Sequence, residues 1–497
     1  MKRNCRCILA LSAAALFSCT ASGTGGGTSP EPSSSSSPSS SHSSSSPLEY
    51  PSASIELLEK DPATEFPKST YRYAPGSSTL GLTYSLSEDK TYYSVSNKNH
   101  GLSTSNLVIP STYEGLPVKE IEAEAFTELT WLESVTIPSS ISKIGDGAFS
   151  RTGLKRVYFD AEEAQDFNAR NWVFYSSEQK ETEVYIGPHV KRIPANFMRP
   201  LSTDPKVARK VTKLEIDSSS SLLSIGAYAF YGNEGLKSVA FPASLRQIEE
   251  SAFEGCGLGK ADLSSCVKIA AKAFFECPNL QAVAWGEGLQ ELGSYAFAGT
   301  SLAQADLELC PLKEIPDHAF ASCSSLKKLY LPSSCLSLGE SAFENSALER
   351  FDSWNLTSIG EDCFRGAPLH QIWLRESLSL GQEAFSGNLG EVEKLVISSD
   401  LADLEAGNGV FSGLLCQEAV FAKGVTTVPS RLFFPTQNAA QAPRLETIHL
   451  PSTLSRIGQN AFFGAQVGKA FLWGEKNRLD GGEGNQSLLE AMEEVRA

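Results

Sequence analysis

The chain has 497 residues, of which 41% are hydrophobic and 20% are charged. This length exceeds what one globular core normally organises, so several domains or a repeat array are expected. With 58 acidic against 42 basic side chains, the formal net charge is −16; this balance disfavours nucleic-acid partners, because their binding depends on neutralising phosphates.

The first residues have the pattern of a secretory signal peptide. Lys2, Arg3 and Arg6 precede an apolar run at residues 8–17. This run is too short to span a bilayer and fits the apolar centre of a cleaved signal. The sequence therefore predicts a signal peptide over residues 1–18.

The stretch LFSC, which ends at Cys19, resembles the lipobox of bacterial lipoproteins, although Phe17 stands where the strict pattern has a small residue. The resemblance implies that Cys19 is the lipidation site, because in lipoproteins this sulfur takes a diacylglycerol and the chain is cut just before it. The membrane contact would then be the lipid anchor alone. The alternative is a plain signal peptide that is cut elsewhere, such as after Ala21 or Ser22.

Residues 20–47 consist almost entirely of Ser, Gly, Pro and Thr. Such a composition cannot bury an apolar core and behaves as a flexible tether. We therefore interpret residues 19–69 as a lipidated cysteine followed by a linker, which would lift a folded domain off a membrane.

One motif returns from Leu107 onward: a short apolar strand, often a proline, an apolar pair and finally Ala-Phe. In the most regular stretch the closing phenylalanines follow one another at intervals of 21 or 23 residues. They are Phe230, Phe253, Phe274, Phe297, Phe320, Phe343, Phe364 and Phe385. A constant period in the low twenties indicates a solenoid, in which each small unit buries its apolar face against its neighbours.

A typical unit begins with LKSVAFP at residues 236–242. Leu236, Val239 and Phe241 are expected to point toward the core, and the proline ends the strand because it lacks an N–H donor. Glycines recur before the closing Ala-Phe, and we attribute them to a bend that needs their conformational freedom. Examples are Gly145, Gly226 and Gly339.

The period breaks between Phe149 and Phe230, where residues 160–177 and 198–209 are interpreted as insertions. Farther on the units lengthen, and their expected closing residues are Phe411, Phe433 and Phe462. Near the polar end of the chain, residues 486–496 are expected to form a short helix.

This pattern resembles the BspA-like branch of bacterial leucine-rich repeats. That family commonly opens with a hairpin carrying Tyr-Ser-Val, here residues 93–95, and an Ile-Pro-Ser-Thr-Tyr-x-Gly-x-Pro-Val stretch, here residues 109–118. The fold expected is a strand-rich α/β leucine-rich-repeat solenoid of about 14 rungs, with short parallel strands on one face and turns or helical segments on the other. Residues 70–105 are assigned to an N-terminal cap, 106–473 to the repeats and 474–497 to a polar tail.

Stacked strands place one outward residue per rung in a continuous column, with rungs about 4.8 Å apart. The sequence predicts this column as Val108, Thr136, Tyr158, Tyr185, Glu215, Ala240, Asp262, Ala284, Asp306, Tyr330, Asp352, Trp373, Val396, Val420, His449 and Leu472.

Two parts of the column are candidate ligand-binding patches. The first consists of Tyr330, Asp352 and Trp373, with Lys328, Arg350 and Gln371 beside them. The second consists of Tyr158 and Tyr185. Exposed Tyr, Trp and Arg side chains are typical of protein interfaces, and an aromatic and carboxylate ladder also suits a glycan. The alternative is that these aromatics only favour strand surfaces.

No motif in the sequence supports catalysis, a cofactor or a metal. The six histidines are scattered, and HExxH, P-loop, GxSxG and dinucleotide-binding patterns are absent from the sequence. Cysteines recur without any CxxC pair. Cys256 and Cys277 each follow a repeat phenylalanine by three residues, which leaves two readings open: small buried fillers, or a disulfide between adjacent rungs.

We therefore expect a non-enzymatic lipoprotein of the bacterial outer membrane or cell surface that binds a protein or glycan through its solenoid. The family resemblance implies an adhesin for host extracellular-matrix proteins or for other cells. Two alternatives remain, a polysaccharide-capture lipoprotein and a periplasmic scaffold, neither of them catalytic.

Overall fold

The computed structural model describes residues 50–51, 61, 64–169, 173–176, 180–200, 209–375, 378–388, 390–401, 409–437 and 441–495. The predicted signal peptide and the lipidation site Cys19 lie outside the described residues. Residues 50–497 form one compact unit.

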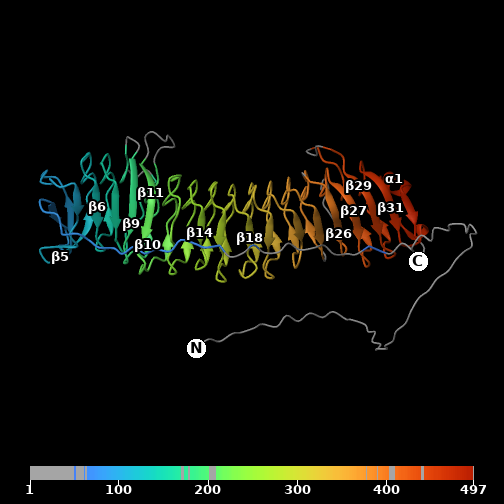
Figure 1. Ribbon diagram of the computed structural model, residues 1–497, viewed down its shortest axis with the longest axis horizontal. Coiled ribbons are helices and arrows are strands. Elements are labelled where there is room, and N and C mark those ends of the chain that lie inside the picture. Colours follow the sequence, from blue (N-terminus) through green and yellow to red (C-terminus); the bar gives the residue numbers. More distant parts are fainter. Residues whose placement is uncertain are drawn as a thin grey trace, which may run out of the picture. The chain divides into compact units, whose positions relative to one another are not determined.

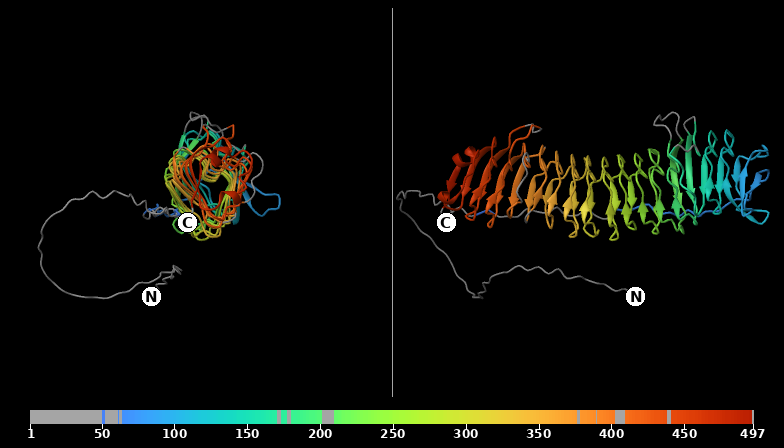
Figure 2. Two further views of the ribbon diagram at one scale, coloured as in Figure 1. Left: turned by 90° about the vertical axis from the view of Figure 1, so that its right-hand side faces the viewer. Right: turned by 180° about the vertical axis from the view of Figure 1, so that it is seen from behind.

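This unit is a strand-rich solenoid of about 16 turns stacked along one axis (Figure 1). Seen along that axis, the turns overlie one another (Figure 2). The predicted solenoid is thus confirmed, with more rungs than the expected 14. The helical segments expected opposite the strands are replaced by turns and two-residue strands. Among the described residues the only helices are η1 (Lys476–Arg478) and α1 (Gln486–Glu490), both near the C-terminus.

The longer strands share one side of the coil, which we call the long-strand face, and all their pairings are parallel. They are β3 (Asn106–Val108), β6 (Ser134–Ile137), β8 (Arg156–Phe159), β9 (Lys180–Ile186), β11 (Arg209–Ile216), β14 (Lys260–Asp262), β16 (Ala282–Ala284), β18 (Gln304–Asp306), β20 (Lys328–Tyr330), β22 (Arg350–Asp352), β24 (Gln371–Leu374), β26 (Val392–Ile397), β27 (Leu415–Phe421), β29 (Arg444–Leu450), β31 (Gln466–Leu472) and β32 (Met492–Glu494).

A second set of parallel strands, each only two residues long, forms another side of the coil. They are β7 (Lys143–Ile144), β10 (Arg192–Ile193), β12 (Ser224–Ile225), β13 (Gln247–Ile248), β15 (Lys268–Ile269), β17 (Glu291–Leu292), β19 (Glu314–Ile315), β21 (Ser337–Leu338), β23 (Ser358–Ile359), β25 (Ser379–Leu380), β28 (Thr427–Val428) and β30 (Arg456–Ile457). Their apolar second residue points into the core, as the repeated polar–apolar pairs require.

The first rung is covered by an antiparallel hairpin of β1 (Thr83–Leu86) and β2 (Tyr93–Ser96). Strand β2 pairs with β5 (Leu116–Ile121), which also pairs with β4 (Thr112–Tyr113). The rings of Tyr84 and Tyr113 stack 3.8 Å apart, and Tyr93 packs against both edge-on. Such a cover satisfies the need of a solenoid to close its terminal apolar face.

The closing phenylalanines form a ladder of stacked rings through the core. Neighbouring rings lie between 5.0 and 5.8 Å apart, as in the pair Phe274 and Phe297 at 5.3 Å. The predicted continuation through Phe411, Phe433 and Phe462 is confirmed. This ladder ties each rung to the next over most of the coil.

The interpretation of residues 160–177 as an insertion is wrong in part. Phe174 lies within that segment, yet its ring stacks 5.5 Å from Phe149 and continues the ladder. The ladder is interrupted in the next rung, where the backbone register places Met198 at the phenylalanine position and Phe197 at the alanine position. Phe197 therefore meets Phe230 at 78° instead of stacking on it.

The recurrent glycines have a different role from the one expected. Gly145, Gly226 and Gly339 all lie outside the left-handed region of φ. A Cβ atom at these positions would lie 2.3 to 2.5 Å from backbone nitrogen atoms of the preceding rung. They are required because the rungs approach closely there, whereas the bend itself needs no special backbone freedom.

All eight cysteines in the described part of the chain are free and buried. The sulfur of Cys277 lies 3.0 Å from the carbonyl oxygen of Phe253, and that of Cys256 lies 3.1 Å from the carbonyl of Phe230. Of the two readings left open, these residues follow that of buried fillers, with a weak hydrogen bond between rungs. Burial raises the pKa of the Cys277 thiol to about 12, so the reactive thiolate is strongly disfavoured.

Candidate functional site

Strand pairing bears out the predicted column within each sheet, with one error at its end, but some of its members, including Val396 and Val420, are buried. Strand pairing places Asp352 beside Trp373, Trp373 beside Val396, and Val420 beside His449. His449 pairs with Phe471, whereas Leu472 pairs with Leu450 and is only 1% exposed. Leu472 therefore points inward, and Phe471 takes its place in the column, which β32 continues with Glu493.

A groove with a volume of about 390 Å³ opens on the long-strand face over β20 and β22. These two strands belong to different sheets, so the groove lies where the ladder of strands is interrupted. Its lining residues are Glu308, Lys327, Lys328, Leu329, Tyr330, Leu331, Arg350, Phe351, Asp352, Trp354 and Arg375. We call this set the groove.

The structure brings four of the six residues of the first predicted patch into the groove. They are Lys328, Tyr330, Arg350 and Asp352. Gln371 lies outside the lining, and its side-chain oxygen is buried without a hydrogen-bond partner among the described residues. Trp373 also lies outside the lining, but its ring contacts Arg375, which is a groove residue.

Arg375 organises one wall of the groove. Its guanidinium group binds both carboxylate oxygens of Asp352, at 2.6 and 2.8 Å, and lies 3.2 Å from the ring centroid of Trp373. A bidentate ion pair stacked on an indole is a rigid arrangement. The negative charge of Asp352 is therefore balanced by Arg375, and the guanidinium group of Arg375 packs over the indole ring of Trp373.

Trp354 and Arg375 are groove residues that the column prediction missed. The indole of Trp354 is 58% exposed and lies 4.9 Å from the Arg375 guanidinium. The equivalent turn position in other rungs holds a small or a charged residue, such as Ala243, Ser264 or Glu308. An aromatic residue at a position that is otherwise small or charged was the available signal, but the column considered only one position per strand.

The charge of the groove differs from that of the chain. Its lining includes four cationic side chains and two carboxylates, although the whole chain carries a net charge of −16. One of the two carboxylates, Asp352, is already paired with Arg375. Lys327 and Lys328 also have carboxylate partners, Glu349 and Asp61, which lie outside the lining. An anionic ligand group that binds these lysines must therefore displace a carboxylate that is already present.

The second predicted patch is formed, but another part of the chain covers it. The rings of Tyr158 and Tyr185 stack 4.8 Å apart. The ring of Tyr71 lies 5.2 Å from that of Tyr185, and burial raises the pKa of the Tyr185 hydroxyl. Tyr71 belongs to residues 64–79, which we call the strap; they follow the coil as the blue segment in Figure 1.

The described part of the chain contains no cluster of three or more His, Cys, Asp or Glu side chains suited to a metal ion. Among the same residues, no helix has the length and apolarity required to cross a membrane.

Comparison with known families and structures places these features in context. The sequence matches the BspA type leucine rich repeat region in six copies, over residues 98–199, 208–310 and 310–418. No curated protein matches the chain.

Three solved structures show similarity in fold. A leucine-rich repeat protein from Bacteroides ovatus is 19% identical, with 66% of this chain and 94% of that chain covered and a TM-score of 0.36. A leucine rich cell surface protein from Faecalibacterium prausnitzii is 17% identical, with coverage of 82% and 97% and a TM-score of 0.31. The pneumococcal vaccine antigen PcpA is 16% identical, with coverage of 85% and 98% and a TM-score of 0.32.

Proposed function

Because this chain belongs to the BspA-type leucine-rich-repeat family, we propose that it is a bacterial surface protein that binds a ligand in the groove and performs no catalysis. The observation that carries this proposal is the groove itself. Half-buried Tyr330 and exposed Trp354 lie beside Arg350 and Arg375 on neighbouring rungs of the coil. Aromatic and arginine side chains in a desolvated hollow are the usual source of binding energy at protein interfaces.

The ligand we propose is a protein, such as a host extracellular-matrix protein or a protein on another cell. The groove combines apolar walls at Leu329, Leu331 and Phe351 with charged groups, a combination that suits a peptide segment with mixed side chains. A glycan is the second candidate, since Tyr330 and Trp354 could also serve as sugar-stacking rings.

A binding screen tests the class of ligand. The purified chain without residues 1–19 is applied to an array of matrix proteins and glycans. We expect saturable binding to at least one protein. Binding to glycans alone would favour the polysaccharide-capture alternative, and binding to neither would contradict a ligand-binding role toward these classes.

We also propose that Cys19 anchors the protein to the cell surface by its lipid. The basic and apolar signal pattern and the Ser-rich tether before the folded unit support this proposal. Protease added to intact cells should remove the folded unit, and Cys19→Ala should release the protein from the membrane fraction. Full protection from protease would instead support the periplasmic-scaffold alternative.

A further inference from the structure

The strap runs along the solenoid in the direction opposite to the order of the rungs. Its last residue, Thr79, donates a backbone hydrogen bond to Val108 of β3 at 2.9 Å. Farther back, the carbonyl of Glu65 accepts a hydrogen bond from Lys260 of β14 at 3.3 Å. Asp61, which precedes the strap, reaches β18 and β20. The contacts therefore pass along the long-strand face toward the groove as the chain is followed backward.

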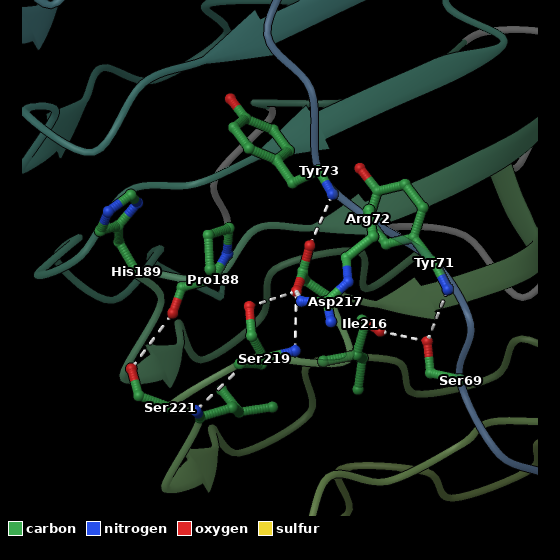
Figure 3. A network of polar contacts seen from close by, with 12 residues as sticks. Ser69, Tyr71, Arg72, Tyr73, Pro188, His189, Ile216, Asp217, Ser219 and Ser221 are labelled. Atoms are coloured by element: carbon green, nitrogen blue, oxygen red, sulfur yellow. Dashed lines mark hydrogen bonds and ion pairs between the residues drawn. The ribbon is translucent and has the colours of Figure 1, made fainter.

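The best-held part of the strap is a latch at the end of β11 (Figure 3). The backbone N–H of Tyr73 donates to a carboxylate oxygen of Asp217 at 2.5 Å, and the hydroxyl of Ser69 donates to the carbonyl of Ile216 at 2.5 Å. Arg72 lies 3.6 Å from the same carboxylate. Asp217 is 3% exposed, so the carboxylate that accepts these contacts is buried.

Asp217 is held in its charged form. Burial acts to raise the pKa of its carboxyl group, but hydrogen bonds from Ser219 and from the Tyr73 backbone outweigh that effect, and the pKa lies below its usual value. The latch is therefore intact at neutral pH.

Between the latch and the groove the strap is held less closely. A cavity of about 500 Å³ lies between Thr64 and Phe66 of the strap and residues of the solenoid that include Val283 of β16 and Trp285. The described strap residues contain no strand. The segment is thus held by a few separate contacts, and it does not form a continuous ladder that would add to the sheet.

The contact nearest the groove involves one of the groove's own cations. The carboxylate of Asp61 lies 2.6 Å from the ammonium group of Lys328, and its backbone N–H donates to the side chain of Gln304 at 3.2 Å. A carboxylate from another part of the same chain therefore already occupies the lysine at the edge of the groove.

From these contacts we propose that the ligand of the groove is an extended segment bearing a carboxylate, and that Asp61 and the strap are its competitor within the same chain. This inference rests on the proposed function, because it names the ligand class and the regulation of the same groove. A ligand carboxylate must replace Asp61 at Lys328, and the contacts of the strap with Asp217 and Tyr185 determine how readily the strap is displaced.

The experiment uses a fluorescent peptide of residues 55–66 as the probe, added to the chain without residues 1–19. The protein variant Asp61→Asn with Tyr71→Ala weakens the internal competitor without changing the solenoid. We expect at least tenfold tighter peptide binding to this variant than to the wild type. The gain should be lost when the peptide itself carries Asp61→Asn, and also when Lys328→Ala is added to the variant.

Equal peptide affinity for wild type and variant, no binding to the variant, or binding that is indifferent to Lys328 would overturn the inference. Circular dichroism and the melting temperature verify that the variant is folded, and trypsin cleavage after Lys68 or Arg72 reports release of the strap. A ligand from the array that requires Trp354 but binds no more tightly to the variant would remove this inference and leave the proposed function standing. Peptide binding without any groove-dependent array ligand would show that Lys328 takes the chain's own segment, but it would contradict the proposed function and with it the inference about the ligand.

Discussion

Replacing one ring of the phenylalanine ladder should have the largest effect on stability. Phe274 is fully buried and lies between Phe253 at 5.5 Å and Phe297 at 5.3 Å. Phe274→Ala removes these contacts and leaves a cavity that the neighbouring rungs cannot close. We expect the free energy of unfolding, measured by urea denaturation, to fall by about 3–5 kcal/mol.

The matched control is Phe463→Ala, the same substitution at a ring that is 48% exposed and stacks only on Phe434, 5.5 Å away. We expect a loss of about 1 kcal/mol or less there. If the two substitutions destabilised the protein equally, the ladder would not be the principal contact between rungs.

Adding a single methyl group should also destabilise the coil where two rungs nearly touch. A Cβ atom on Gly293 would lie 2.1 Å from the backbone nitrogen of Ala271 and 2.4 Å from the carbonyl carbon of Ala270. Because these are backbone atoms of the preceding rung, relief requires a shift of the whole turn. We expect Gly293→Ala to lower the free energy of unfolding by about 3 kcal/mol.

Gly288, only five positions away, offers a control at which the same substitution should not lower the free energy of unfolding. Its Cβ would meet nothing closer than the Cys266 carbonyl oxygen at 4.0 Å, and its φ lies outside the left-handed region. Gly288→Ala should leave stability unchanged or raise it by about 0.4–1 kcal/mol, since alanine restricts the unfolded chain. A stable Gly293→Ala protein would show that the rungs have more freedom than their packing indicates.

The coil could be predicted well because the period of the sequence motif equals the number of residues in one turn of the coil. Each rung needs one large ring in the core, so the spacing of Phe230 to Phe385 directly reports the turns. The predicted position of a residue within its rung was wrong at two places. At Phe197 the ring moves to the alanine position, and at Leu472 the inward and outward residues were exchanged by one step, which in a strand reverses the face.

The candidate site was only half predictable, for a related reason. Tyr330 and Asp352 follow the strand pattern and were identified, whereas Trp354 and Arg375 come from the turns that follow the strands. The bond between Arg375 and Asp352 depends on the stacking of two rungs and on side-chain reach. The alternation of inward and outward residues along a strand indicates neither which rungs stack nor how far a side chain reaches.

The strap was not predictable from periodicity at all. Residues 64–69 were assigned to the flexible linker, and residues 70–79 to the cap because a solenoid end needs one; neither stretch carries an apolar repeat. Its contacts join residues far apart in the sequence, such as Tyr71 with Tyr185 and Asp61 with Lys328. These contacts are single hydrogen bonds, ion pairs and ring contacts, which leave no pattern in composition.

The central claim is that ligands bind in the groove, and the most direct measurement is the affinity of groove variants for the protein ligand found on the array. Tyr330→Ala with Trp354→Ala should weaken that affinity at least tenfold, a loss of about 1.4 kcal/mol or more. Trp131→Ala, at an indole that is 43% exposed and lies outside the groove lining, should leave it unchanged. Unchanged affinity in the double variant, with or without a loss at Trp131, would contradict the account.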